Sequence, residues 1–123
     1  GVMLKLGGYG LIRVFYIFVD LVSISSFFFI SISLLGGLFV SLFCLIQSDL
    51  SVLVAYSSVS HMGLVICGLM SLTCFGYMGS LYLMLSHGLV SSGLFYFVGS
   101  LFDRLGSRSM FLIKGLINFA PSL

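Results

Sequence analysis

Long uncharged segments separated by short polar turns dominate this chain. Residues 27–46, 50–72 and 77–102 contain no Asp, Glu, Lys or Arg, and each is long enough for a membrane-spanning helix, which needs roughly 20 apolar residues. Inside a bilayer, a helix pairs its own backbone N–H and C=O groups. The sequence therefore predicts an all-α, polytopic transmembrane helix bundle without strands. We expect a single membrane domain, 1–123, with spans at about 1–19, 27–46, 50–72 and 77–102, and the start of another at about 111–123.

The composition favours a membrane protein and argues against other classes. Only 7% of the residues are charged, against about 25% in an average soluble domain, so a soluble fold would have too few charges to cover its surface. The net charge of +2 gives no indication of nucleic-acid binding. The chain opens within one apolar stretch and stops soon after another has begun. We therefore expect a fragment of a larger membrane protein.

Polar residues mark the expected ends of the spans. Asp20 and the serines that follow it at 23, 25 and 26 should form a break after the first span. Residues 47–49 should form a short turn, and 73–76 a tight uncharged connection. The segment 103–108 is the most polar part of the chain, so it should form a loop after the fourth span.

Basic residues predict which side of the membrane these turns face. Short turns make neighbouring spans antiparallel, so the turn at 47–49 and the loop from 103 to 114 should lie on the same side. That side carries Arg104, Arg108 and Lys114, whereas the opposite side has only Arg13 nearby. Because an excess of basic residues marks the cytoplasmic or matrix side, we assign these turns to it. Pro121 should lie at or near a break in the last helix, because it removes a backbone hydrogen bond.

Two histidines lie near the middle of otherwise uncharged spans. Counted from Leu50 and Tyr77, His61 and His87 should each lie about 15 Å deep at 1.5 Å of helix per residue, near the middle of a ~30 Å hydrocarbon core. An ionisable group at that depth is expensive and usually marks a path for ions or protons. Histidine can both accept and donate a proton near neutral pH. We therefore expect both side chains to face the bundle interior and to act in a proton relay.

Serines near the two histidines could support such a relay. Ser57 precedes His61 by one helical turn and Ser91 follows His87 by one turn, so each pair shares a helix face. Ser60 adds a further hydroxyl next to His61. The structural alternative is a histidine that bonds to a neighbouring carbonyl or serine and holds helices together.

Lys5 is a third ionisable group flanked by apolar residues. It could store a proton in the same polar interior, or it could extend its amine toward water from a helix end. The following Gly8-Tyr9-Gly10 resembles part of a potassium filter, but a lysine and a leucine precede the glycines where a filter has Thr-Val-type carbonyl donors. We expect these glycines to let helices pack closely.

The chain contains no motif for a redox, hydrolytic or metal centre. Cys44, Cys67 and Cys74 lack metal-ligand spacing, and we interpret them as small buried hydrophobic residues. No nucleotide fingerprint, P-loop or iron–sulfur cysteine set occurs in the sequence. We therefore expect no cofactor and no metal ion in this chain itself.

Several motifs run in order along nearly the whole chain: Leu4-Lys5-Leu6-Gly7-Gly8-Tyr9-Gly10 followed by Arg13, Gln47-Ser48-Asp49-Leu50, Ala55-Tyr56-Ser57-Ser58-Val59-Ser60-His61-Met62, Ser86-His87-Gly88-Leu89 with Ser91-Ser92, the segment 104–109, and Lys114-Gly115-Leu116. Together these motifs resemble one known family, the subunit 4 family of mitochondrial NADH:ubiquinone oxidoreductase (respiratory complex I), and their sequences are most similar to those of arthropod members.

The resemblance implies an antiporter-like fold of fourteen helices, of which this chain would hold the second half of the eighth to the start of the twelfth. In the family, the lysine before Gly-Gly-Tyr-Gly and the histidines of Ser-His-Met and Ser-His-Gly belong to a central hydrophilic axis. They match Lys5, His61 and His87. The axis glutamates and a further lysine lie outside this chain. The sequence departs from the family at Ser51, where a lysine near the membrane surface is usual.

The resemblance also implies a function and a setting. The chain would belong to a proton-translocating, multi-pass subunit in the mitochondrial inner membrane, in contact with lipid and with other membrane subunits of complex I. NADH, FMN, iron–sulfur clusters and ubiquinone would bind elsewhere in the complex.

Two alternatives remain open. One is a subunit of a multi-subunit cation/proton antiporter, which shares the fold and much of the polar pattern. The other is a non-transporting membrane scaffold, in which replacing the histidines would not affect transport.

Overall fold

Four helices make up the described part of this chain. The computed structural model describes residues 2–113 and contains α1 (Met3–Ile17), α2 (Val19–Ile46), α3 (Leu50–Met70) and α4 (Cys74–Leu105). The described residues form no strand. The helices α2, α3 and α4 are each long and apolar enough to span a membrane. The predicted all-α transmembrane bundle is therefore confirmed.

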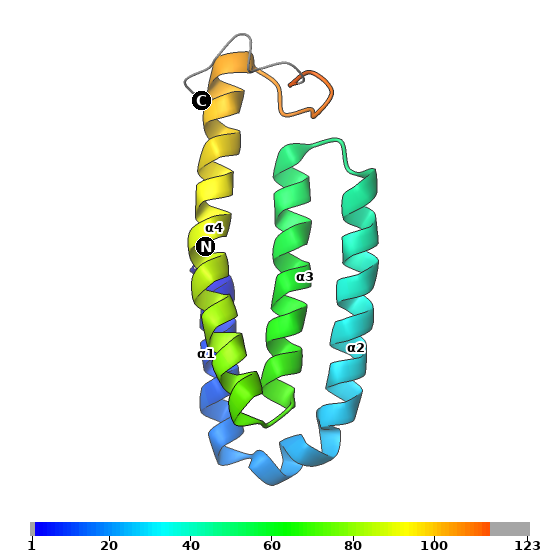
Figure 1. Ribbon diagram of the computed structural model, residues 1–123, viewed down its shortest axis with the longest axis vertical. Helices are drawn as coiled ribbons and strands as arrows, with labels where there is room; N and C mark the ends of the chain where they lie inside the picture. The colour runs from blue at the N-terminus through cyan, green and yellow to red at the C-terminus, as the bar shows by residue number, and fades with distance from the viewer. Residues whose placement is uncertain (1, 114–123) are drawn as a thin grey trace.

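The helices run up and down beside one another. Figure 1 shows α3 between α2 and α4, with α1 beside the lower half of α4. The core is small and lies where α1, α3 and α4 meet: Val65 and Leu69 of α3 and Met84 of α4 form a buried cluster, against which Leu11, Ile12 and Phe15 of α1 pack. Most other large apolar side chains are exposed. Apolar surface of this extent marks contact with lipid or with other protein segments.

The predicted break after the first span lies at Phe18, two residues before Asp20, where α1 has ended and α2 has not begun. The serines expected to extend this break are helical, because α2 already begins at Val19. The hydroxyls of Ser23 and Ser26 donate hydrogen bonds of 2.7 and 2.9 Å to carbonyls one turn earlier, and Ser25 bonds the carbonyl of Leu21 at 3.0 Å. Serines bonded in this way stay helical and often bend a helix. Figure 1 shows this bend: the first turns of α2 cross the lower end of the bundle before the helix rises beside α3.

The helix α4 is longer than the predicted 77–102. The hydroxyl oxygen of Thr73 accepts a hydrogen bond of 3.1 Å from the backbone N–H of Gly76, so the helix begins three residues earlier. Gly106 ends it in a left-handed conformation with φ 67°, which glycine adopts without strain. With 32 residues, α4 is about 48 Å long and exceeds the ~30 Å hydrocarbon core. Among the described helices, only α3, with 21 residues, has the length of about 17–25 residues that is usual for a membrane span.

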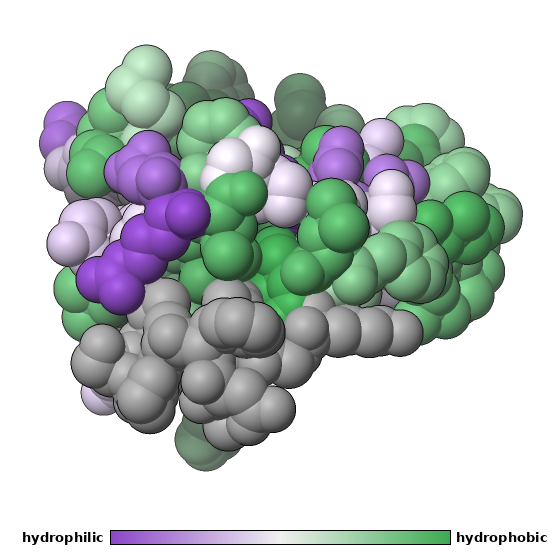
Figure 2. Space-filling model, turned by 90° about the horizontal axis from the view of Figure 1, so that it is seen from above, coloured by the Kyte–Doolittle hydropathy of each residue, from purple (hydrophilic) through white to green (hydrophobic). Residues whose placement is uncertain are grey.

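The loop after α4 is attached to the turn between α2 and α3. The N–H of Leu50 donates to the carbonyl of Arg108 at 3.2 Å, and the N–H of Met110 donates to the carbonyl of Ser48 at 2.9 Å. The guanidinium of Arg108 lies 4.4 Å from the centre of the Phe102 ring. Seen from this end in Figure 2, hydrophilic residues gather beside apolar ones.

These contacts place the two polar segments at the same end of the bundle, as the antiparallel spans require. Lys114, Pro121 and nearly all of the expected span at 111–123 lie outside the described residues. The assignment of this end to the cytoplasmic or matrix side stays a prediction.

Candidate functional site

The structure brings His61 of α3 and His87 of α4 together. Their ring centroids are 5.3 Å apart and the ring planes are inclined by 51°. We expected only a similar depth, with side chains that need not touch. Direct contact arises because α3 and α4 are antiparallel neighbours joined by a tight turn. The two residues lie at comparable distances from it, His61 nine residues before Met70 and His87 thirteen residues after Cys74.

The two imidazoles differ in their surroundings. His87 is 9% exposed, and its Nδ1 atom is buried without a hydrogen-bond partner among the described residues. His61 is exposed among the described residues, although it lies against His87 and beside the serines of α2. That both histidines face the interior of the complete subunit stays a prediction. The pair lines a cavity of about 280 Å³ together with Leu83, Ser86 and Val90.

Lys5 of α1 approaches α4 one residue beyond His87. Its Cε atom lies 3.7 Å from the position that a Cβ on Gly88 would occupy. The Nζ atom of Lys5 is buried and has no hydrogen-bond partner among the described residues. A buried amine without a partner is costly, and burial of this kind in a membrane segment points to a functional group. Lys5 also lines a cavity of about 450 Å³ with Gly88 and Ser92.

The serines predicted to support the histidines bond to their own helices. Ser57 donates to the carbonyl of Val54 at 2.7 Å, Ser60 to that of Ser57 at 2.8 Å, and Ser91 to that of Gly88 at 3.5 Å. Each hydroxyl oxygen keeps free lone pairs and can still accept a hydrogen bond. The structure shows no direct bond from these serines to either histidine.

Sequence reasoning missed two serines of α2. Ser33 and Ser41 line a cavity of about 280 Å³ together with Ser60 and His61. The signal was present in the sequence, because Ser33, Gly37 and Ser41 recur at intervals of four and so share one helix face. Ser33 also lies 2.9 Å from the sulfur of Cys67.

Polar groups from all four helices therefore lie in one row. Lys5 comes from α1, His87 from α4 and His61 from α3, and the serine-lined cavity beside His61 continues to α2. Amines, imidazoles and hydroxyls can pass a proton along such a row, either directly or through water.

Within residues 2–113, no group of three or more His, Cys, Asp or Glu side chains could hold a metal ion. The predicted burial of the cysteines is wrong for Cys74, which is exposed.

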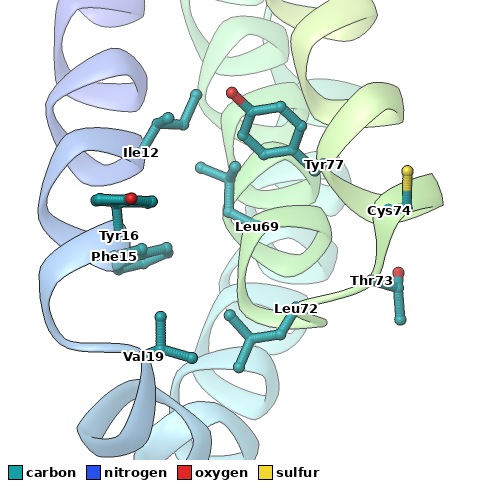
Figure 3. Close-up of a pocket in the computed structure, with 9 residues that line it drawn as sticks. All are labelled: Ile12, Phe15, Tyr16, Val19, Leu69, Leu72, Thr73, Cys74 and Tyr77. Atoms are coloured by element: carbon teal, nitrogen blue, oxygen red, sulfur yellow. The ribbon is translucent and has the colours of Figure 1, made fainter.

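A further cavity lies apart from this row and is almost wholly apolar. It measures about 380 Å³ and lies between the end of α1 and the turn that joins α3 to α4. Figure 3 shows Ile12 and Phe15 of α1 facing Leu69 and Tyr77 across it. Its lining contains no lysine, histidine or carboxylate, so it does not extend the row of polar groups.

The comparisons with known proteins agree with the fold and with the resemblance. The family described as NADH:quinone oxidoreductase/Mrp antiporter, transmembrane, matches residues 1–123. Proteins named NADH-ubiquinone oxidoreductase chain 4 are similar over the whole chain: those of Aedes aegypti, Ceratitis capitata and Mytilus edulis are 55%, 54% and 48% identical. The chain spans about 28% of the length of each of these relatives. The chain thus belongs to the NADH:quinone oxidoreductase/Mrp antiporter transmembrane family.

Proposed function

We propose that this chain is part of a proton-translocating membrane subunit of NADH:ubiquinone oxidoreductase in the mitochondrial inner membrane. Lys5, His87 and His61 carry protons through it, and Ser57, Ser60 and Ser91 supply hydroxyls along the route. The chain contributes no redox centre. NADH, FMN, iron–sulfur clusters and ubiquinone bind in other parts of the complex, and the outer faces of the bundle meet lipid and neighbouring membrane subunits.

The observation that carries this proposal is the row formed by Lys5, His87 and His61. The three residues come from three helices, and both Lys5 and His87 keep a buried polar atom without a hydrogen-bond partner among the described residues. A purely structural histidine would be expected to satisfy its buried nitrogen within the bundle. Two imidazoles in ring contact offer four nitrogen atoms, and these can exchange a proton directly or through one water molecule.

Replacing Lys5 in the full-length subunit, within the assembled complex, tests the proposal. Lys5→Ala should lower coupled proton pumping and leave NADH oxidation by a hydrophilic artificial acceptor nearly unchanged, because electron transfer takes place elsewhere. Lys5→Arg is the matched control. Arginine keeps its charge permanently, so it should also fail if the residue must release a proton, whereas it would restore a purely structural cation. Full pumping by Lys5→Ala would refute the role.

A further inference from the structure

We propose that Gly8 of α1 and Met84 of α4 are positioning residues for the proton relay. Their contact sets the separation of α1 and α4 and so holds Lys5 against α4 beside His87. This inference rests on the proposed function and adds two residues that carry no proton themselves.

Gly8 packs tightly against α4. It is the buried residue of α1 among those described, and a Cβ added to it would overlap the sulfur of Met84. The neighbouring glycines behave differently, because a Cβ at Gly7 or Gly10 would meet nothing within 4 Å. Of the three glycines that follow Lys5, only Gly8 therefore has to be a glycine for α1 and α4 to approach each other.

Met84 lies between the buried core and the cavity that Lys5 lines. Its side chain is 6% exposed and belongs to the buried cluster with Val65 and Leu69 of α3, and it also borders the cavity of about 450 Å³ beside Lys5. A methyl group at Gly8 would thus push α1 away from α4 or force the flexible end of Met84 into that cavity, and either change would displace Lys5. Ordinary carbon contacts are about 3.5–4.0 Å, so relief of the overlap requires a shift of roughly 1 Å.

The same shift would reach Lys5. Lys5 and Gly8 are three residues apart on α1, and Met84 and Gly88 are four apart on α4, so each pair lies on one helix face. The helices run in opposite directions, which places the Lys5–Gly88 contact one turn from the Gly8–Met84 contact. Moving α1 outward therefore also moves the amine of Lys5 away from His87. Displacements of about 1 Å can lower the rate of a reaction roughly 100-fold.

The test uses the full-length subunit in the assembled complex. Gly8→Ala should lower the number of protons pumped per electron at least twofold, while the rate of NADH oxidation by a hydrophilic artificial acceptor stays unchanged. Adding Met84→Ala makes room for the new methyl group, so the double variant should recover most of the lost pumping. Gly7→Ala makes the same chemical change in open space and should pump like the unchanged complex. A merely structural role would lower assembly and every activity together.

Several results would overturn the inference: normal pumping by Gly8→Ala, an equal loss in Gly7→Ala, or no recovery when Met84→Ala is added. If Gly8→Ala fails to assemble, the double variant still decides, because assembly with pumping supports the inference and assembly without pumping contradicts it. Lys5→Ala separates the two proposals. Full pumping in that variant refutes the relay, whereas loss in Lys5→Ala with normal pumping in Gly8→Ala refutes only the positioning role.

Discussion

Replacing Lys5 with methionine should stabilise the 123-residue chain while removing the amine that we propose carries a proton. The stem of Lys5 packs against Gly88, and its amine is buried without a hydrogen-bond partner among the described residues. Methionine has a similar length and keeps the stem contact, but it has no amine to desolvate. Burying a polar group without a hydrogen bond costs about 1–3 kcal/mol in mutational data. We therefore expect Lys5→Met to raise the free energy of unfolding by about 1–3 kcal/mol.

The assay is titration of the chain in mild-detergent micelles with SDS, followed by far-ultraviolet circular dichroism. Arg13→Met on the same helix is the control. Arg13 is exposed and donates a hydrogen bond of 3.1 Å to the hydroxyl of Tyr9, so its replacement should change the unfolding free energy by less than about 0.5 kcal/mol. If Lys5→Met lowers the unfolding free energy, or matches Arg13→Met, the amine carries no burial penalty and the reasoning fails.

Three further outcomes are expected. A Cβ at Gly76 would lie 2.5 Å from the carbonyl oxygen of Gly68, whereas one at Gly79 meets nothing within 4 Å. In the same titration, Gly76→Ala should therefore destabilise the chain by about 1–3 kcal/mol. Gly79→Ala should stabilise the chain by up to ~1 kcal/mol. Equal effects of the two substitutions would contradict the packing of α3 on α4. Thr73→Ala removes the hydrogen-bond acceptor at the start of α4 and should lower the free energy of unfolding by about 1 kcal/mol. The same substitution should accelerate hydrogen exchange at the Gly76 amide. Unchanged exchange would show that the Thr73 cap is not formed. The 123-residue chain alone in liposomes should carry no more protons than protein-free liposomes under an imposed pH gradient, and flux abolished by His61→Ala would show that it conducts without the rest of the subunit.

The hydropathy pattern was sufficient to predict the class of fold, because uncharged stretches of this length have few solutions other than membrane helices. It did not predict where the helices end. Serines after Asp20 read as a break, yet they bond back to the helix and only bend it. The ends of α4 depend on the Thr73 cap and the left-handed Gly106. A hydropathy pattern contains no information about either feature.

The site was predictable only in part, for a related reason. The depth of His61 and His87 follows from counting residues along each helix, so their proximity could be predicted from the sequence. Which side each histidine faces depends on how the helices rotate against one another, and hydropathy does not give this rotation: within the described residues His87 is buried and His61 is exposed. The contact between Gly8 and Met84 likewise depends on the crossing of α1 and α4, and the sequence indicated only that the glycines favour close packing.

The most direct test of the central claim is the number of protons pumped per electron in Lys5→Ala, His87→Ala and the double variant, measured in the complete complex. Residues that act in one series behave as a unit, so their losses are not additive. If Lys5 and His87 belong to a single row, each single variant should lower the ratio by a similar amount and the double variant should lower it no further. Single variants that pump normally, or losses that add in the double variant, would contradict a shared proton path through these residues.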